Sequence, residues 1–235
     1  NAKGKALVVS GSNDPAVQTL IVAINSLLGS YGSTIDTSTQ SYVRQGIDSE
    51  VNALVEEMAS GKVNALFIVN CNPLYNLALP KFKEALGQVG LRISFSTHLD
   101  ETSASCNYIM PVHHYLEAWG DAEPVKGYYT LQQPTINHLH KTRHFEDNLL
   151  KWSGDTRDYY TYLKENWAKN IYPKQKTFAS AEECWKNALH DGILELPAGE
   201  AKVLEPKVDV AAAASAIKEG PKGTELVLYT KVGLG

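Results

Sequence analysis

The chain has 235 residues and a formal net charge of −4, from 22 basic and 26 acidic side chains. Apolar residues make up 43% and charged residues 20%, an ordinary balance for a globular protein of one large domain or a domain with an appendage. The slight acidity argues against nucleic acid or an anionic membrane surface as the main partner. No apolar run approaches the ~18 residues that span a bilayer, so direct membrane insertion is not expected.

The first part of the chain alternates strand-like and helical patterns. Predicted strands are Lys5–Ser10, a possible short one at Ser33–Asp36, Ala65–Asn70 (buried on both faces), Leu91–Thr97 and Asn107–Met110. Predicted helices are Pro15–Leu28 with Asp14 as N-cap and a stop at Gly29, a helix capped by Asp48 or Ser49 that ends before Gly61, and Pro80–Leu86. Such alternation with short links predicts an α/β fold with a right-handed, doubly wound parallel sheet.

After Asp121 the pattern changes. The run Tyr128–Gln133, with Pro124 and Pro134 around it, predicts extended, loop-like structure over the edge of the sheet. Further on we expect helices at Glu146–Trp152, Asp155–Asn170 and Ser180–Leu189, an irregular stretch Ile193–Lys207, a short helix or tether at Ala211–Ala214 and a final strand Glu225–Lys231. The predicted domains are therefore residues 3–150, Rossmann-like, and residues 151–235, a mostly helical extension. Asn1-Ala2 and the stop at Gly235 favour a piece cut from a longer protein.

Polar side chains follow two of the predicted core strands, where open α/β sheets hold ligands. Asn72 comes after the first of these strands, and Asp100, Glu101 and Thr102 come after the second. Adjacent carboxylates on an extended chain point to opposite sides, so Asp100 and Glu101 do not form an acid/base pair. They remain candidates for pocket groups that accept hydrogen bonds, for helix caps, or for solvated surface side chains.

Other motifs give weaker indications of chemistry. Gly11-Ser12-Asn13 has one glycine where the dinucleotide fingerprint needs three, and no GxSxG is present. His113 and His114 with Glu117 have a spacing that could bind a metal on a helix, but further ligands are missing and structural hydrogen bonds explain them as well. The three cysteines are too far apart for a cluster or zinc motif and are expected to be buried apolar residues: Cys71, Cys106 and Cys184. No catalytic or metal-binding residue is predicted.

Taken together, several of these motifs resemble the molybdopterin oxidoreductase family. Its pattern of a strand with G-N-P, then E-T-A, A-D-x-x-L-P and E-x-x-G-T, resembles the series Asn72-Pro73, Asp100-Glu101-Thr102, Tyr108–Pro111 and Glu117 with Gly120. Finer details resemble one branch, the molybdopterin-like iron–sulfur subunit of alternative complex III: NPLYN at 72–76, HxxLExWGDA at 113–122, GYYTLQQPTI at 127–136, Thr142-Arg143 and the tail ELVLYTKVGLG.

The resemblance implies a dimethyl sulfoxide reductase/formate dehydrogenase-type fold and places Asn72, Asp100, Glu101, Thr102, Glu117 and Gly120 at positions that contact a pterin guanine dinucleotide in true molybdenum enzymes. Here Cys71 replaces the family's glycine, Ser103 its alanine and Asp121 its threonine. A carboxylate where a small hydroxyl meets the dinucleotide implies a vestigial pocket without cofactor.

The resemblance therefore implies a scaffold domain, non-catalytic in itself, of a respiratory quinol:cytochrome c (or other electron-acceptor) oxidoreductase. Iron–sulfur clusters are expected elsewhere in the parent protein, and the partners are its other domains and neighbouring subunits of a membrane-bound complex, with no nucleic acid. By the same resemblance the complex lies on the periplasmic side of a bacterial inner membrane, the fragment itself being soluble. The alternative is the dinucleotide-binding domain of a true molybdenum enzyme similar to polysulfide or thiosulfate reductase, which would hold molybdopterin guanine dinucleotide.

Overall fold

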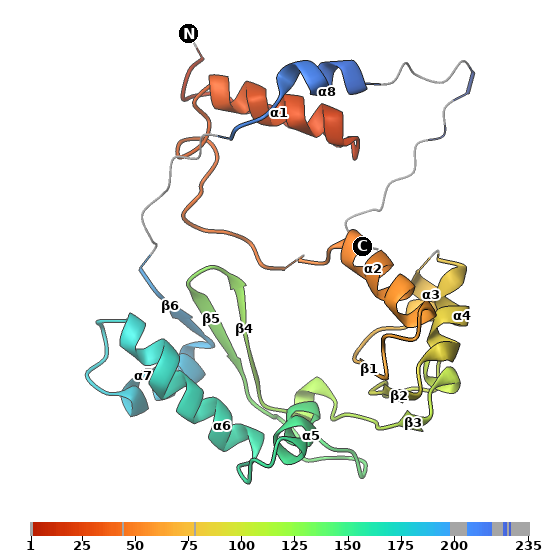
Figure 1. Ribbon diagram of the computed structural model, residues 1–235. Coiled ribbons are helices and arrows are strands. Elements are labelled where there is room, and N and C mark those ends of the chain that lie inside the picture. The colour runs from red at the N-terminus through yellow and green to blue at the C-terminus, as the bar shows by residue number, and fades with distance from the viewer. Residues whose placement is uncertain are drawn as a thin grey trace. The chain divides into compact units, whose positions relative to one another are not determined.

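The computed structural model describes residues 2–43, 45–77, 79–197, 206–217, 223–224 and 226. The chain divides into two compact units, unit 1 (Asn1–Gln40 with Gly199–Gly235) and unit 2 (Ser41–Ala198). Their elements are labelled in Figure 1. The domain division at residue 150 stays a prediction. No helix in the described ranges is long and apolar enough to cross a membrane.

Unit 1 is built on helix α1 (Pro15–Leu27), beside which the short helix α8 (Val210–Ala216) packs (Figure 1). The start of α1 is as predicted, because Asp14 Oδ1 accepts hydrogen bonds from the N–H groups of Ala16 (2.7 Å) and Val17 (3.4 Å). Its end is as predicted too: Gly29 has φ +64°, the left-handed conformation that glycine adopts without strain. Both ends of α1 are thus fixed by residues next to the helix in the sequence.

The predicted strand Lys5–Ser10 is wrong, because these residues pair with no strand in the described part of the chain. A buried side chain takes the place of a neighbouring strand: the N–H of Val8 donates to Asn25 Oδ1 (2.9 Å), and Asn25 Nδ2 donates to the carbonyl of Val8 (2.8 Å). Ser30 Oγ donates to the carbonyl of Ala6 (2.9 Å). The possible strand at Ser33–Asp36 is likewise a turn, closed by one isolated bridge between Tyr31 and Ile35.

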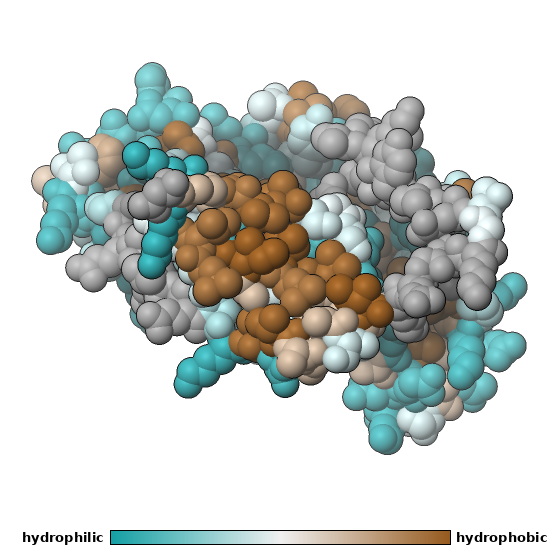
Figure 2. All heavy atoms as spheres, turned by 90° about the horizontal axis from the view of Figure 1, so that it is seen from above, coloured by the Kyte–Doolittle hydropathy of each residue, from teal (hydrophilic) through white to brown (hydrophobic). Residues whose placement is uncertain are grey.

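Large apolar side chains lie exposed on unit 1. Figure 2 shows a continuous hydrophobic patch on the face seen from above. The exposed apolar residues of this unit include Leu7 (49%), Val9 (78%), Ile24 (40%) and Leu27 (79%), with Val210 (48%) on α8. Contiguous apolar patches of this kind in a protein usually mark contacts with other polypeptide.

Unit 2 contains the predicted parallel sheet. Its strands are β1 (Ala65–Ile68), β2 (Leu91–Ser94) and β3 (Tyr108–Ile109), in the order β1-β2-β3 and all parallel. The α/β class with a parallel sheet is therefore confirmed, although each strand is shorter than predicted. The order shows no reversal among these strands, so the double winding stays a prediction.

Two helices cover one face of this sheet, α2 (Asp48–Ala59) and α4 (Lys81–Gln88), and the single-turn α3 (Pro73–Asn76) follows β1. The N-cap of α2 is Ile47, with no side-chain hydrogen bond, rather than Asp48 or Ser49 as predicted; Asp48 and Glu50 instead lie in the first turn, where they favour the helix dipole. The core on this face is made by Val55, Met58, Ile68, Phe82, Ala85, Leu86 and Val89.

The other face of the sheet is only partly covered, so the prediction that Ala65–Asn70 is buried on both faces is wrong. Phe67 is 42% exposed, and its ring meets Trp152 of helix α5 (Phe145–Trp152) at 5.4 Å between centroids. Phe95 below it is fully buried and packs edge-on against Phe145 (4.8 Å). One short helix cannot cover three strands, which leaves part of this face to solvent.

An antiparallel sheet follows, and here the prediction of loop-like structure is wrong. Its strands are β4 (Gly120–Val125), β5 (Tyr128–Gln132) and β6 (Ile193–Glu195), with β5 in the centre. The hairpin turns at Lys126-Gly127, where Gly127 has φ +86° and its N–H donates to Glu123 Oε1 (2.8 Å). Strand β6 lies in the stretch Ile193–Lys207 that was predicted to be irregular. The predicted strand Glu225–Lys231 lies outside the described residues apart from Leu226.

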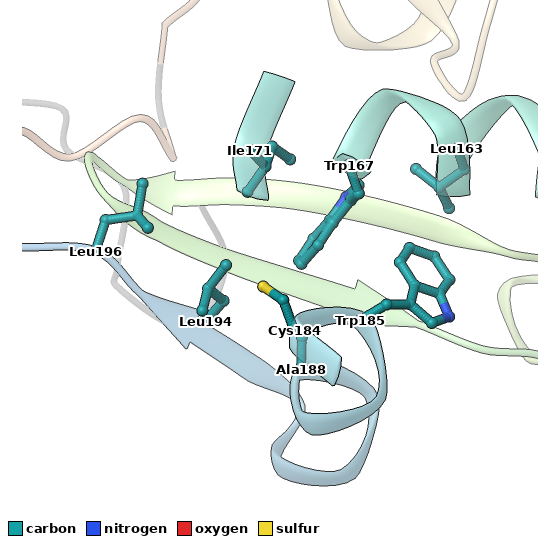
Figure 3. Packing of buried hydrophobic residues seen from close by; sticks show 8 residues of the cluster. All are labelled: Leu163, Trp167, Ile171, Cys184, Trp185, Ala188, Leu194 and Leu196. Carbon is teal, nitrogen blue, oxygen red and sulfur yellow. The ribbon is translucent and has the colours of Figure 1, made fainter. Parts of the chain in front are cut away.

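The helical part packs on this second sheet. Helix α6 (Tyr159–Asn166) begins later than the predicted Asp155 because Asp158 is its N-cap, and it continues into a π-helical turn, Trp167–Ile171. Helix α7 (Ala181–Asp191) is close to the prediction, with Ser180 as N-cap and Gly192 (φ +75°) after its end. Figure 3 shows the core between these helices and the sheet, made by Leu163, Trp167, Ile171, Cys184, Trp185, Ala188, Leu194 and Leu196. The remaining short turns are 3₁₀: Ser103–Ser105, Tyr115–Glu117 and Tyr172–Lys174.

Candidate functional site

Three of the predicted site residues form one hydrogen-bonded network at the carboxyl ends of β1 and β2. Thr102 Oγ1 donates to Asn72 Oδ1 (2.6 Å), and Asn72 Nδ2 donates to Glu101 Oε2 (2.6 Å). Thr102 Oγ1 also accepts from the N–H of Leu74 at the start of α3 (3.0 Å). Thr102 is fully buried, so its hydroxyl is used entirely within the protein. The network ties the turn after β1 to the turn after β2.

Asp100 lies in the same turn but bonds to a different set of groups. Its Oδ1 accepts from the N–H of Ser103 (2.7 Å), its Oδ2 accepts from Ser96 Oγ (3.0 Å), and its own N–H donates to Ser103 Oγ (2.7 Å). Partial desolvation opposes the charge, but these hydrogen bonds outweigh it and hold the pKa of Asp100 below its usual value. For Glu101 the hydrogen bond from Asn72 has the same effect and lowers the pKa. Both carboxylates therefore stay ionised and structurally engaged.

Glu117 and Gly120 lie outside this network. The two oxygens of Glu117 accept from the N–H of His114 (3.0 Å) and the N–H of Leu139 (2.9 Å), and these bonds lower its pKa. The first of them completes a capping box for the turn Tyr115–Glu117, in which His114 Nδ1 accepts from the N–H of Leu116. Gly120 begins β4 opposite Gln132. Both residues thus have structural roles in the loop and the hairpin.

A cavity of about 540 Å³ lies where sequence analysis expects a ligand, beyond the carboxyl ends of the parallel strands. Val69 and Asn70 after β1 and Thr97 after β2 line it, together with side chains from the segment that follows β3, including Trp119 and His144. Asn70 has φ +52°, the one left-handed non-glycine residue in the described ranges, which turns the chain away at the cavity. None of the six predicted site residues lines this cavity.

A second, wider cavity of about 710 Å³ shares His113, Ala118, Trp119 and His144 with the first. The ring of His113 stacks on that of His138 at 3.8 Å, and burial lowers the pKa of His113. The expectation of a structural role holds for His113, whose Nδ1 lies 2.6 Å from Thr142 Oγ1. The described residues contain no group of three or more side chains placed to hold a metal ion.

His144 was not singled out by sequence analysis, yet it is the most buried histidine of the site. Its Nε2 lies 2.8 Å from the carbonyl of Trp119, and its Nδ1 lies 2.7 Å from Glu146 Oε2. Burial opposes its charge, but two oxygen acceptors at the two ring nitrogens favour the imidazolium, and the pKa of His144 is raised. Correspondingly the pKa of Glu146 is lowered. In the sequence, only the spacing of His144 and Glu146 at the start of a helix could have indicated this pair, and that spacing is too common to be specific.

The departures from the family pattern have local explanations. Asp121 accepts a hydrogen bond from Trp167 Nε1 (2.9 Å), which ties β4 to the π-helical turn of the second core. Ser103 caps the turn with Asp100. Of the cysteines, Cys184 is buried as predicted, Cys106 is half-buried, and Cys71 is exposed, contrary to the prediction; all three are free thiols.

No family model matches the chain. In an alignment 153 residues long that covers 57% of the chain, the chain is 29% identical to a curated protein of Nitratidesulfovibrio vulgaris named menaquinone reductase, molybdopterin-binding-like subunit. The chain is a distant relative of this molybdopterin-like respiratory subunit. The match spans only 22% of that protein's length. The resemblance found in the motifs is therefore supported by an independent comparison, at the level of a molybdopterin-like subunit.

Proposed function

We propose that this chain is a scaffold part of a molybdopterin-like subunit in a quinol-oxidising respiratory complex of the alternative complex III type, with cytochrome c or another protein as electron acceptor. In this proposal it has no catalysis of its own. The iron–sulfur clusters that carry electrons belong to another part of the parent protein, on the periplasmic side of the membrane.

One observation carries the scaffold role. Three of the side chains that correspond to dinucleotide contacts in molybdenum enzymes, Asn72, Glu101 and Thr102, are paired with one another here. A guanine would have to displace Glu101 from Asn72, at 2.6 Å, and Thr102 is fully buried beneath them. Since Glu101 is exposed, the stronger obstacle to a ligand is Thr102, whose buried hydroxyl is already used by Asn72 and by the N–H of Leu74. The distant similarity to a subunit named molybdopterin-binding-like supports the same proposal.

In this proposal the residues present do not fit a pterin guanine dinucleotide. Asp121, where the family has a threonine, accepts a hydrogen bond from Trp167 and is used within the protein in the same way. The partners in this proposal are other domains of the parent protein and neighbouring subunits. The exposed apolar side chains of unit 1, Leu7, Val9 and Leu27 among them, support such contacts.

A second candidate is the dinucleotide-binding domain of a true molybdenum oxidoreductase, acting on polysulfide, thiosulfate or a related acceptor. The cavity of about 540 Å³ at the strand ends favours it, since it has the size and position of a ligand site in an open α/β sheet. The two candidates differ in whether this cavity holds a nucleotide.

The experiment is molybdenum and pterin analysis of the full-length protein purified in its complex, together with thermal unfolding of the chain in the presence of GDP. The scaffold proposal expects neither molybdenum nor pterin and no shift in Tm. A bound ligand at 100 times its Kd would stabilise by about 2.7 kcal/mol. A shift of that size, or stoichiometric molybdenum, would establish the second candidate instead.

A further inference from the structure

A third cavity in unit 2, of about 630 Å³, adjoins the two cavities described above, sharing Thr97, Val112 and His114 with the first and Glu117 and Ile136 with the second. One wall is the segment 111–117 and the other is the segment 136–142, with Thr97 and His98 after β2 closing one side. Its volume lies within the range of sites that hold small organic molecules, about 300–1,000 Å³. None of Asn72, Asp100, Glu101 and Thr102 lines it.

The two walls are fastened together, so the cavity does not depend on a ligand to form. Glu117 bonds to the N–H groups of His114 and Leu139, one in each wall. The N–H groups of Thr135 (2.8 Å) and Ile136 (3.1 Å) donate to the carbonyl of Leu116. At the far end the contact between His113 and Thr142 joins the walls again. A site held in its bound shape loses less conformational freedom when a ligand enters.

The lining combines apolar and cationic side chains. The apolar part consists of Pro111, Val112, Leu116, Ile136 and Leu139. Leu139 is 73% exposed and Ile136 41%, although both are large apolar residues. A ligand that covers these exposed apolar side chains removes them from water, which favours binding.

The polar part of the lining offers donors without partners. Lys141 and His140 form no hydrogen bond or ion pair with the described residues. In His114 the Nδ1 atom accepts from the N–H of Leu116, so a neutral ring carries its hydrogen on Nε2, for which no acceptor lies among the described residues. The acid of the lining, Glu117, is 6% exposed and both its oxygens are taken. Among the described residues that line the cavity, the one cation free to meet a ligand is therefore Lys141, with imidazole N–H groups beside it.

From this juxtaposition we propose that the cavity binds an amphipathic anion, a small molecule with an apolar body against Leu116, Ile136 and Leu139 and a carboxylate or phosphate at Lys141. A preformed apolar cavity with a few convergent donors is the usual form of such a site. The complementary charge decides between ligands of equal apolar size. This site is independent of the scaffold role, because it uses none of the network residues Asn72, Glu101 and Thr102, and Glu117, the one dinucleotide position in its lining, only holds the two walls together.

The test is isothermal titration calorimetry of the full-length protein with decanoate, against decyltrimethylammonium, which carries a ten-carbon tail and the opposite charge. We expect decanoate to bind and the cation to bind at least tenfold more weakly. The proposal is overturned if decanoate does not bind, or if the two probes bind equally well. If decanoate does not bind, an acidic peptide is the next occupant to test.

Variants locate the site. Lys141→Gln should weaken decanoate binding about three- to fivefold, the effect of one exposed ion pair, while Lys126→Gln, in the β4–β5 turn outside the cavity, should leave it unchanged. His114→Asn keeps an N-cap acceptor and removes the Nε2 donor, so it should weaken binding with little change in Tm.

For the apolar part, Leu139→Gln should weaken binding, and Leu99→Gln is its matched control, since Leu99 is 76% exposed and does not line the cavity. In NMR spectra decanoate should shift the imidazole signals of His114 and His140 and leave that of His190 on α7 unchanged. Equal binding by Lys141→Gln, Leu139→Gln and the wild type would show that decanoate binds elsewhere and would refute the assignment.

Discussion

Replacing Thr102 by valine separates a structural network from a ligand pocket. Valine has nearly the shape of threonine but cannot donate to Asn72 Oδ1 or accept from the N–H of Leu74, the two bonds that Thr102 Oγ1 makes at 2.6 and 3.0 Å. Thr102 is fully buried, so water cannot readily replace either partner. An unsatisfied buried polar group costs about 1–3 kcal/mol. We expect the free energy of unfolding to fall by about 2–4 kcal/mol in Thr102→Val.

The assay is urea unfolding at neutral pH, followed by circular dichroism and tryptophan fluorescence. Thr102→Ser is the matched control: it keeps the hydroxyl and removes one methyl group, so its loss should stay near 1 kcal/mol. Adding Asn72→Ala to each variant completes a double-mutant cycle, in which the hydroxyl and the amide should show a coupling of about 0.5–3 kcal/mol.

The opposite result would have a clear meaning. If Thr102→Val unfolds within about 0.5 kcal/mol of the wild type, the hydroxyl is not holding the two turns together, and the argument for a scaffold loses its main support. Replacing a residue whose role is to contact a ligand would change the free energy of unfolding little and weaken ligand binding strongly.

Three further outcomes are expected. Arg92→Ala should lower the urea midpoint, with a loss of about 1–2 kcal/mol, because the guanidinium Nη1 donates to three carbonyls at the end of α4, the shortest contact being 2.9 Å; an unchanged midpoint would contradict this. Trp167→Phe keeps a ring in the second core but removes the bond to Asp121, so thermal unfolding should show a loss of about 1–3 kcal/mol, and Asp121→Ala should add little to it. Finally, the pKa of His144 is raised and that of Glu146 is lowered, so their pair stabilises the fold fully between pH 4.5 and pH 6.5, the ordinary pKa values of the two groups. Tm should fall when the pH rises through the raised pKa of His144, and it should also fall when the pH drops through the lowered pKa of Glu146. Glu146→Gln should reduce both changes in Tm.

Where local chemistry decides the structure, the sequence was sufficient. Asp14 before Pro15, Gly29 after an apolar helix, and Ser180 before α7 each specify a helix end by a hydrogen bond or a backbone conformation within a few residues. The parallel sheet was predictable in the same way, because short apolar runs alternate with helices. The ends of its strands were not, since pairing stops where a neighbouring strand stops, and that depends on distant residues.

The errors have long-range causes. The apolar run Lys5–Ser10 is as good a strand pattern as Ala65–Ile68, but its backbone partner is the side chain of Asn25, 17 residues away. The β4–β5 hairpin was missed because Pro124 suggested a loop, although Lys126-Gly127 between two extended runs was a usable turn signal. At the candidate site the pattern brought Asn72, Glu101 and Thr102 together correctly, and it could not show that they would bond to one another.

The amide of Asn25 has a consequence for how unit 1 meets other chains. One side-chain amide offers a single carbonyl and a single NH₂, so it completes the backbone of Val8 and nothing beyond it. In an extended segment, neighbouring residues direct their N–H and C=O groups to opposite sides. The backbone N–H and C=O groups of Leu7 and Val9 therefore have no partner among the described residues, and the apolar side chains beside them are exposed. A strand from another polypeptide could pair with this unpaired edge, whose backbone is already held in place by Asn25. We therefore expect strand addition at this edge in the assembled protein, and self-association there in a concentrated solution of the isolated chain.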